Sequence, residues 1–310
     1  MQIKHLEIKN QTLQNIKFDA ISVKAMLNGV GDAGSQQVDF SKANIQVILN
    51  RDNKPHVIMQ SNLKILGLAS TLNTLNQAAF ATGAPIAEQL VNGQSSMISF
   101  NIPLGGVIDL HGGDTIYVEV QTNSGLFLNP SLEAASYLEV KPMKCYGVEK
   151  MIPRIRAMVI QQNEASNQYM VGDNLIRLAL LNFDKTDFKN NVVNNVVFSS
   201  DRLDDTFNFS DLIAKKQSQF GNQLISNSAN DIAALIQNDQ SFLLTDFNQE
   251  FDAVTLDISF NAPNVTAATN YIVTWNYDTD WTIIEKANAK VASFDEQTKK
   301  KLDQATTLKK

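Results

Sequence analysis

The residue types that most often carry out catalysis are few in this sequence and lie far apart in it. There are three histidines, His5, His56 and His111, and none stands at a spacing that would bring two of them together as zinc ligands. The single cysteine, Cys145, excludes an intrachain disulfide and has no histidine or basic cluster beside it that would activate the thiol. We therefore expect a structural cysteine, and neither a zinc site nor a cysteine-dependent active site.

Glycine motifs that bind phosphate or expose a nucleophile are also missing. The sequence contains no Gly-x-Ser-x-Gly, no Gly-x-x-x-x-Gly-Lys and no Gly-x-Gly-x-x-Gly. Two glycine pairs, at 105–106 and 112–113, flank the short run 107–111, and we interpret them as turns around a strand rather than as an anion-binding nest. No catalytic residue and no cofactor is predicted, so the chain is not expected to be an enzyme.

Acidic residues offer the one candidate for a metal site. Asp201, Asp204 and Asp205 lie within five positions and could hold Ca²⁺ between loops, although they lack the pattern of an EF-hand. A solvated acidic loop is the simpler interpretation. A glycosidase would need two carboxylates that face each other about 5–10 Å apart, which sequence spacing does not establish. A structural calcium site is therefore kept only as a hypothesis.

The C-terminal segment 286–310 differs in charge from the rest of the chain. It holds seven lysines and three acidic residues, whereas the whole chain has a formal net charge of −6. The acidic remainder argues against nucleic-acid binding by the body of the protein. The tail could contact anionic lipid headgroups or nucleic acid, or it could be a frayed, solvated helix. The lysines that define this candidate surface are Lys290, Lys299, Lys300, Lys301, Lys309 and Lys310.

The elements that must position these residues are mainly strands. Apolar and polar residues alternate over 115–120 and 254–260, which predicts half-buried strands, and the polar cluster at 50–55 predicts a hairpin turn between two more. In the strand that begins near residue 16, the apolar phase slips by one position at Ala20–Ile21. Such a slip predicts a β-bulge or a strand that changes sheets.

Helical spacing is confined to three segments. Residues 63–75 follow Ser61 and Asn62, either of which could cap the helix N-terminus. A second helix is expected within 226–236, and a third, weakly amphipathic one over 286–308. These predict short helices between strands and one terminal helix.

Similar segments recur along the chain. Ile98–Pro103 and Ile258–Pro263 share five of six residues 160 positions apart, and Val47-Ile48 matches Val159-Ile160 at a spacing of 112. We interpret these matches as two tandem, diverged copies of one β-sandwich domain. The spacing between matching segments grows from 112 to 160 positions along the chain, which would place 48 extra residues in the second copy.

The length and composition fit two such domains. Of the 310 residues, 44% are hydrophobic and 19% charged, which is enough apolar material for real cores. We expect an all-β chain with short helices: a first sandwich over 1–147, a second over 148–285 with a large insertion at about 182–246, and a basic C-terminal helix over 286–310. No segment has the pattern of a signal peptide or the apolar length of a membrane span.

Two tandem sandwiches with helices between strands, a large loop in the second copy and no catalytic motif resemble the double jelly-roll major capsid proteins. That family forms the shells of tailless icosahedral viruses with an internal membrane. The resemblance rests on the repeat at 98–103 and 258–263 and on the hairpin-then-helix pattern at 47–68. Size and an Asn-, Gln- and Phe-rich composition are closest to members from lipid-containing flavobacterial phages.

This resemblance implies a self-assembling structural protein of the virion, made in the host cytoplasm. It implies homotrimers that form pseudo-hexagonal tiles and that contact neighbouring capsomers and other virion proteins, such as penton and membrane proteins, without binding a specific nucleic acid. Segment 182–246 would supply exterior or intersubunit contacts. The tail from Lys286 would face the inner lipid membrane or a neighbouring capsomer.

Two other functions fit an all-β chain. A carbohydrate-binding or carbohydrate-active β-sandwich protein would expose aromatic platforms beside paired carboxylates. The chain has only Trp275 and Trp281, and Trp275 lies in a strand that we predict to be buried. A tail-fibre or baseplate component would show fibrous repeats instead of two compact sandwiches.

Overall fold

Strands predominate in the computed structural model of the chain, as the sequence predicts. Among the residues that the structure describes, no helix is both long and apolar enough to cross a lipid bilayer. These described residues are 1–29, 34–71, 86–129, 135–149, 151–159, 166–172, 174–182, 193–199, 204–208, 242–251, 254–260 and 270–278.

The first half of the chain forms one β-sandwich. Its sheets have the strand orders β1-β10-β3-β8 and β6-β5-β9-β2, and β4 (Ser35–Val38) and β7 (Ile86–Gln89) pair as a separate ribbon. The eight strands of the two sheets are β1 (Gln2–Ile3), β2 (Ile8–Leu13), β3 (Lys17–Asn28), β5 (Ala43–Arg51), β6 (Lys54–Asn62), β8 (Ser95–Asp109), β9 (Thr115–Thr122) and β10 (Tyr137–Lys144).

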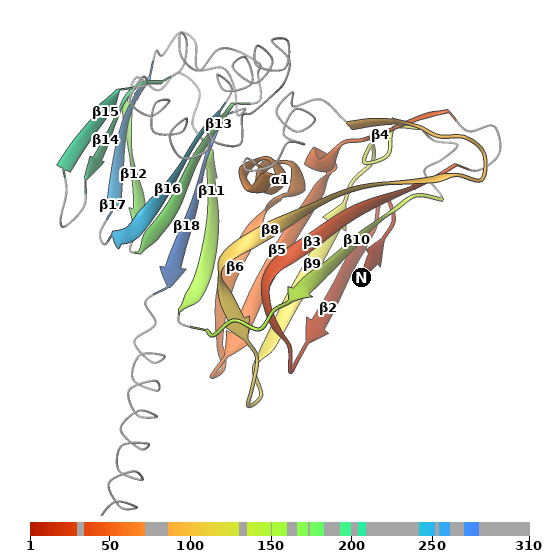
Figure 1. The fold of residues 1–310 in the computed structure, drawn as a ribbon, viewed down its shortest axis with the longest axis horizontal. Helices are drawn as coiled ribbons and strands as arrows, with labels where there is room; N and C mark the ends of the chain where they lie inside the picture. The colour runs from red at the N-terminus through yellow and green to blue at the C-terminus, as the bar shows by residue number, and fades with distance from the viewer. Residues whose placement is uncertain are drawn as a thin grey trace, which may run out of the picture.

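The second half forms another sandwich, which lies beside the first (Figure 1). Its sheets have the orders β16-β13-β18-β11 and β12-β17-β14-β15. The strands are β11 (Ile152–Val159), β12 (Ser166–Gly172), β13 (Leu175–Asn182), β14 (Val193–Ser199), β15 (Asp204–Asn208), β16 (Phe242–Phe251), β17 (Val254–Phe260) and β18 (Asn270–Asp278).

The two sandwiches have the same topology. When the eight sheet strands of each are numbered in chain order, one sheet of each sandwich joins the first, eighth, third and sixth strands, and the other joins the second, seventh, fourth and fifth. Eight antiparallel strands divided in this way make a jelly roll. The chain is a double jelly roll.

The sequence matches that suggested a duplication do not occupy equivalent positions in this topology. Ile98–Pro103 lies in the sixth strand of the first jelly roll, whereas Ile258 lies in the seventh strand of the second. Val47 lies in a fourth strand and Val159 ends a first strand. The prediction of two sandwiches is confirmed, but the repeat proposed as its basis is wrong, and so is the count of 48 inserted residues. Strands in which apolar and polar residues alternate use mainly a few β-branched and aromatic residue types. Short sequence matches between such strands therefore arise by chance.

The segment expected to be an insertion is partly sheet. Within 182–246, β14 and β15 pair with each other, β14 pairs with β17, and β16 pairs with β13. The expectation of a loop excursion over this whole segment is therefore wrong, because these strands complete the second jelly roll. The predicted helices at 226–236 and 286–308 lie outside the described residues, and the domain boundaries at 147 and 285 stay predictions.

The predicted hairpin at 50–55 is confirmed. Strands β5 and β6 pair antiparallel up to Arg51 and Lys54, and the two residues between them, Asp52 and Asn53, have φ angles of 52° and 61°. Two consecutive left-handed residues are the signature of a type I′ turn, whose twist matches that of the flanking strands. Asn and Asp tolerate this conformation better than most residues.

The predicted helix is α1 (Leu63–Thr71), and Asn62 caps it. The backbone amide of Ile65 donates a hydrogen bond of 2.8 Å to Oδ1 of Asn62, which satisfies an amide that has no partner within the helix. Leu63, Ile65, Leu66 and Ala69 are buried. Helix α1 packs against β8 of the first jelly roll and also touches β13 and β18 of the second (Figure 1).

We expect the Asn62→Ala variant to unfold with a free energy about 1 kcal/mol lower than the parent chain, because the Ile65 amide loses its acceptor. Urea titration followed by circular dichroism measures this difference. Asn44→Ala serves as the control, because Asn44 is an exposed strand residue on β5. Equal losses in the two variants would contradict a capping role for Asn62.

Candidate functional site

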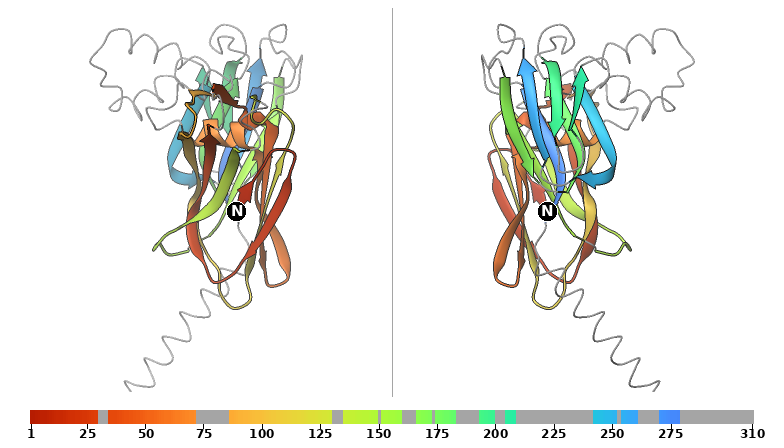
Figure 2. Two further views of the ribbon diagram at one scale, coloured as in Figure 1. Left: turned by 90° about the vertical axis from the view of Figure 1, so that its right-hand side faces the viewer. Right: turned by 90° about the vertical axis from the view of Figure 1, so that its left-hand side faces the viewer.

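The candidate functional site is the junction between the two jelly rolls. Strand β6 of the first lies beside β11 of the second, and the two are bridged in parallel at Met59 and Ile155. The bridge joins four strands from each jelly roll into one eight-stranded sheet. The two views of Figure 2 look along the line that joins the two jelly rolls, with the first in front on the left and the second in front on the right.

A bulge in β8 reaches across this junction. In the pairing of β3 with β8, Phe18 faces Ile108 and Ala20 faces Pro103, so residues 104–107 bulge out of the strand. The bulge predicted from the phase slip near Ala20 is therefore confirmed. It is formed by extra residues on the partner strand, because the longer strand must absorb the change of register.

Two aromatic side chains of β18 bind the backbone of this bulge. The indole Nε1 of Trp275 donates a hydrogen bond of 3.0 Å to the carbonyl of Pro103, and the hydroxyl of Tyr277 donates one of 2.7 Å to the carbonyl of Gly105. Trp275 is 1% exposed, and the guanidinium of Arg177 lies 5.4 Å from its ring centroid. The predicted core position of Trp275 is confirmed, and its indole joins the two jelly rolls.

The glycine pair 105–106 permits this close approach. Gly105 has a φ of 85°, and a Cβ atom there would lie 2.7 Å from Cδ1 of Ile176 on β13. A Cβ on Gly106 would lie 3.0 Å from Cε1 of Tyr277. The interpretation of this pair as a turn is wrong, since both glycines lie inside β8. The second pair, Gly112-Gly113, does form the turn that was expected, with φ angles of 62° and 103°.

An ion cluster fixes the linker that runs from β10 to β11. The Nε of Arg51 donates a hydrogen bond of 2.8 Å to Oδ2 of Asp114, and its Nη1 and Nη2 donate bonds of 2.8 and 3.2 Å to the two carboxylate oxygens of Glu149. Nη2 also bonds the carbonyl of Asp109 at 2.9 Å. The cluster therefore ties the linker residue Glu149 to two hairpin loops of the first jelly roll.

The hydrogen-bond partners of Arg51 stabilise the charged form of its guanidinium. Burial alone would lower the pKa of the Arg51 guanidinium, but its hydrogen bonds and charge interactions with Glu149 and Asp114 outweigh burial and raise that pKa. The three side chains are 11–12% exposed, so solvent screens them weakly. A bidentate pair of this kind holds its geometry better than an exposed lysine pair does.

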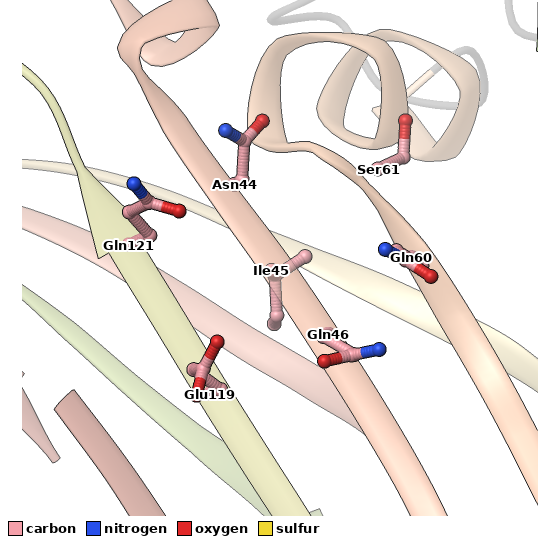
Figure 3. Close-up of a pocket in the computed structure, with 7 residues that line it drawn as sticks. All are labelled: Asn44, Ile45, Gln46, Gln60, Ser61, Glu119 and Gln121. Carbon is pink, nitrogen blue, oxygen red and sulfur yellow. The ribbon is translucent and has the colours of Figure 1, made fainter. Parts of the chain in front are cut away.

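A groove of about 340 Å³ lies on the open face of the first jelly roll (Figure 3). Its walls are mostly amides, and none of the lining residues is aromatic or histidine. The single carboxylate, Glu119, accepts a hydrogen bond from the hydroxyl of Tyr117, which raises the pKa of Tyr117 and keeps it protonated. The groove thus lacks the stacking platform of a sugar site and a second lining carboxylate. The lining residues are Asn44, Ile45, Gln46, Gln60, Ser61, Glu119 and Gln121.

Those candidate residues from sequence that the structure describes do not meet at one place. Asp204 and Asp205 open β15 opposite Ser199 and Phe198, and Asp201 lies outside the described residues, as do all the tail lysines. Among the residues that the structure describes, no group of three or more His, Cys, Asp or Glu side chains could hold a metal ion.

His111 and Cys145 make separate local contacts. Nδ1 of the half-exposed His111 lies 3.1 Å from Oδ1 of Asp109. The backbone amide of Cys145 donates a hydrogen bond of 3.1 Å to the carbonyl of Lys17 at the end of the first jelly roll. Neither residue takes part in the junction.

Several solved structures resemble this fold. The major capsid protein P2 from bacteriophage PM2 matches with 14% identity and a TM-score of 0.49, over 90% of this chain and 95% of that one. A chain from the atomic structure of Sulfolobus turreted icosahedral virus matches with 11% identity and a TM-score of 0.49, over 94% and 96%. PBCV-1 Vp54, fitted into a reconstruction of the virophage Sputnik, matches with 10% identity and a TM-score of 0.49, over 89% and 90%.

These likenesses concern the fold alone. No protein-family model matches the chain, and a search of curated proteins found no relative. The assignment of two jelly rolls rests on the strand pairing of this chain.

Proposed function

We propose that this chain is a major capsid protein, a self-assembling subunit of an icosahedral viral shell that works through its surfaces. The observation that carries the proposal is the junction, which holds two jelly rolls of identical topology side by side in one block. A shell subunit needs a rigid outline that repeats, because symmetric assembly reuses the same contacts many times. The shared sheet, the bulge and the ion cluster together supply that rigidity.

The proposal extends to a homotrimer. Three copies of a chain with two equivalent modules supply six modules, which can surround an axis as a pseudo-hexagonal tile. Such tiles would form the shell of a virion with an internal membrane and meet penton and membrane proteins. The tail lysines would then face lipid headgroups or a neighbouring capsomer, worth about 1 kcal/mol for each lysine near an anionic surface.

The mass of the purified chain in solution tests this proposal. We expect light scattering during size-exclusion chromatography to give about three times the chain mass of 34.3 kDa. Negative-stain electron microscopy of the same peak should show particles with a six-sided outline. A chain that stays monomeric at every concentration up to the millimolar range, and that forms no larger assembly, would contradict the proposal.

A further inference from the structure

Two Asn-Gly dipeptides lie against each other at one end of the first jelly roll. One is 28–29, where β3 ends, and the other is 92–93, in the turn that precedes β8. The backbone amide of Gly93 donates a hydrogen bond of 2.9 Å to the carbonyl of Gly29. Asparagine loses its side-chain amide most readily before glycine, because glycine has no Cβ atom to hinder attack by its backbone nitrogen. Both dipeptides share this chemistry, so their surroundings decide which one reacts.

The side chain of Asn28 is held at both of its polar atoms. Its Oδ1 accepts a hydrogen bond of 2.7 Å from the hydroxyl of Ser95, and its Nδ2 donates one of 2.6 Å to the carbonyl of Ala135. Gly29 is buried, and its backbone amide donates a hydrogen bond of 2.8 Å to the carbonyl of Gln94. The Asn28 side chain can reach the Gly29 nitrogen only after all three bonds have broken.

Asn92, in contrast, lies in an open turn. Residues 91–94 are all exposed, and a hydrogen bond of 2.9 Å from the last amide to the first carbonyl closes the turn. In the described part of the chain, no hydrogen bond engages the Asn92 side chain. Only the bond from the Gly93 amide to Gly29 must open before the Gly93 nitrogen can react. Exposed turns open in this local way far more often than paired strands do.

From this contrast we infer that Asn92 is a site of spontaneous deamidation and that Asn28 is protected from it. The Gly93 nitrogen gives its proton to hydroxide and bonds to Cγ of Asn92, while the Cγ–Nδ2 bond breaks and the side-chain nitrogen takes a proton from water and leaves as ammonia. Water then adds to either carbonyl carbon of the succinimide ring, and the adjacent C–N bond breaks as its nitrogen regains a proton. The product is an aspartate or an isoaspartate at position 92, and water is the only co-reactant.

The modification changes both charge and backbone at this end of the jelly roll. Either product adds one negative charge. An isoaspartate also carries the main chain through its side-chain carbon, which lengthens the turn by one atom and moves the Gly93 amide away from the carbonyl of Gly29. The chemistry itself does not depend on the proposed function. In a shell subunit that is not replaced after assembly, the change would accumulate as the particle ages.

Peptide mass spectrometry of the full chain, incubated at mildly alkaline pH, tests this inference. We expect Asn92 to deamidate at least about tenfold faster than Asn28 in the folded protein, because Asn28 must break two more hydrogen bonds of ordinary strength. In guanidinium chloride the two rates should differ by less than about threefold, because the fold no longer protects either site. Asn123 is the control for the glycine, since it is exposed but precedes a serine, and it should react more slowly than Asn92.

A serine variant tests why Asn28 is protected. Ser95→Ala removes the hydroxyl that binds Oδ1 of Asn28, and we expect deamidation of Asn28 to become about 3–10-fold faster. Ser96→Ala is the matched control, because Ser96 lies opposite Leu27 instead, and should leave that rate unchanged. Deamidation of Asn92 in the folded chain no faster than that of Asn28 or Asn123 would overturn the assignment of the site. Equal Asn28 rates in the two serine variants would overturn the explanation of its protection.

Discussion

The Trp275→Ala variant should lose about 3–5 kcal/mol of its free energy of unfolding, the largest effect that we expect from one substitution. The indole is 1% exposed at the junction, so truncation removes buried apolar surface and leaves a cavity between the two jelly rolls. It also leaves the carbonyl of Pro103 without its donor. Urea unfolding monitored by far-ultraviolet circular dichroism measures the loss.

Two further variants separate packing from hydrogen bonding. Trp275→Phe keeps a buried ring but removes the bond to Pro103, and we expect a loss of about 1–2 kcal/mol for the missing bond and the small gap. Met170→Ala changes a 77% exposed side chain on β12 and should shift stability by less than about 0.5 kcal/mol. If Trp275→Ala lost no more free energy of unfolding than Met170→Ala, the indole would not hold the junction together.

The Arg51→Met variant should lose about 2–4 kcal/mol of its free energy of unfolding. The substitution keeps much of the apolar stem but leaves the carboxylates of Asp114 and Glu149 close together without their shared cation, each 12% exposed. The linker held by Glu149 should loosen as well. We therefore expect limited proteolysis to cut this variant between the two jelly rolls faster than it cuts the parent chain.

An exposed ion pair provides the control for this prediction. Lys9→Met breaks the pair between Lys9 and Glu7, whose side chains are 46% and 32% exposed, and should cost no more than about 1 kcal/mol. The double variant Arg51→Met with Glu149→Gln should recover part of the loss, because it removes one of the orphaned charges. Equal costs for the Arg51 and Lys9 variants would show that the cluster does not stabilise the linker.

Local features of the fold could be predicted from local sequence. The Asp52-Asn53 turn and the Asn62 cap depend on backbone conformations and hydrogen bonds within a few residues, so composition at those positions indicates them directly. Alternation also placed Trp275 in a buried strand. These predictions needed no knowledge of the partner strands.

The junction depends on pairs that are distant in the chain. Arg51 meets Asp114 and Glu149 across 63 and 98 positions, and nothing in the sequence around each of these charged residues indicates its distant partner. One signal was available. A glycine pair inside a strand pattern indicates a bulge or a close backbone approach, and Gly105-Gly106 is such a pair.

The apparent repeat shows how pattern and topology can disagree. The matching hexamers lie in a sixth and a seventh strand, so their likeness reflects the shared demands of alternating strands. The two jelly rolls are equivalent in the order in which their strands pair. At this degree of sequence divergence, short sequence matches do not reveal that equivalence.

The pairing of β1 with β10 sets an order in which the chain can be built during synthesis. Gln2 lies opposite Glu139, so the first jelly roll cannot close until most of its strands have left the ribosome. Contacts this distant in sequence make folding slow. Strand β11 follows directly in the chain and lies against the already completed β6. The first jelly roll thus presents a completed strand edge to the second jelly roll while the second is being synthesised. Errors in the closure of the first jelly roll would then disturb the pairing of the strands that follow.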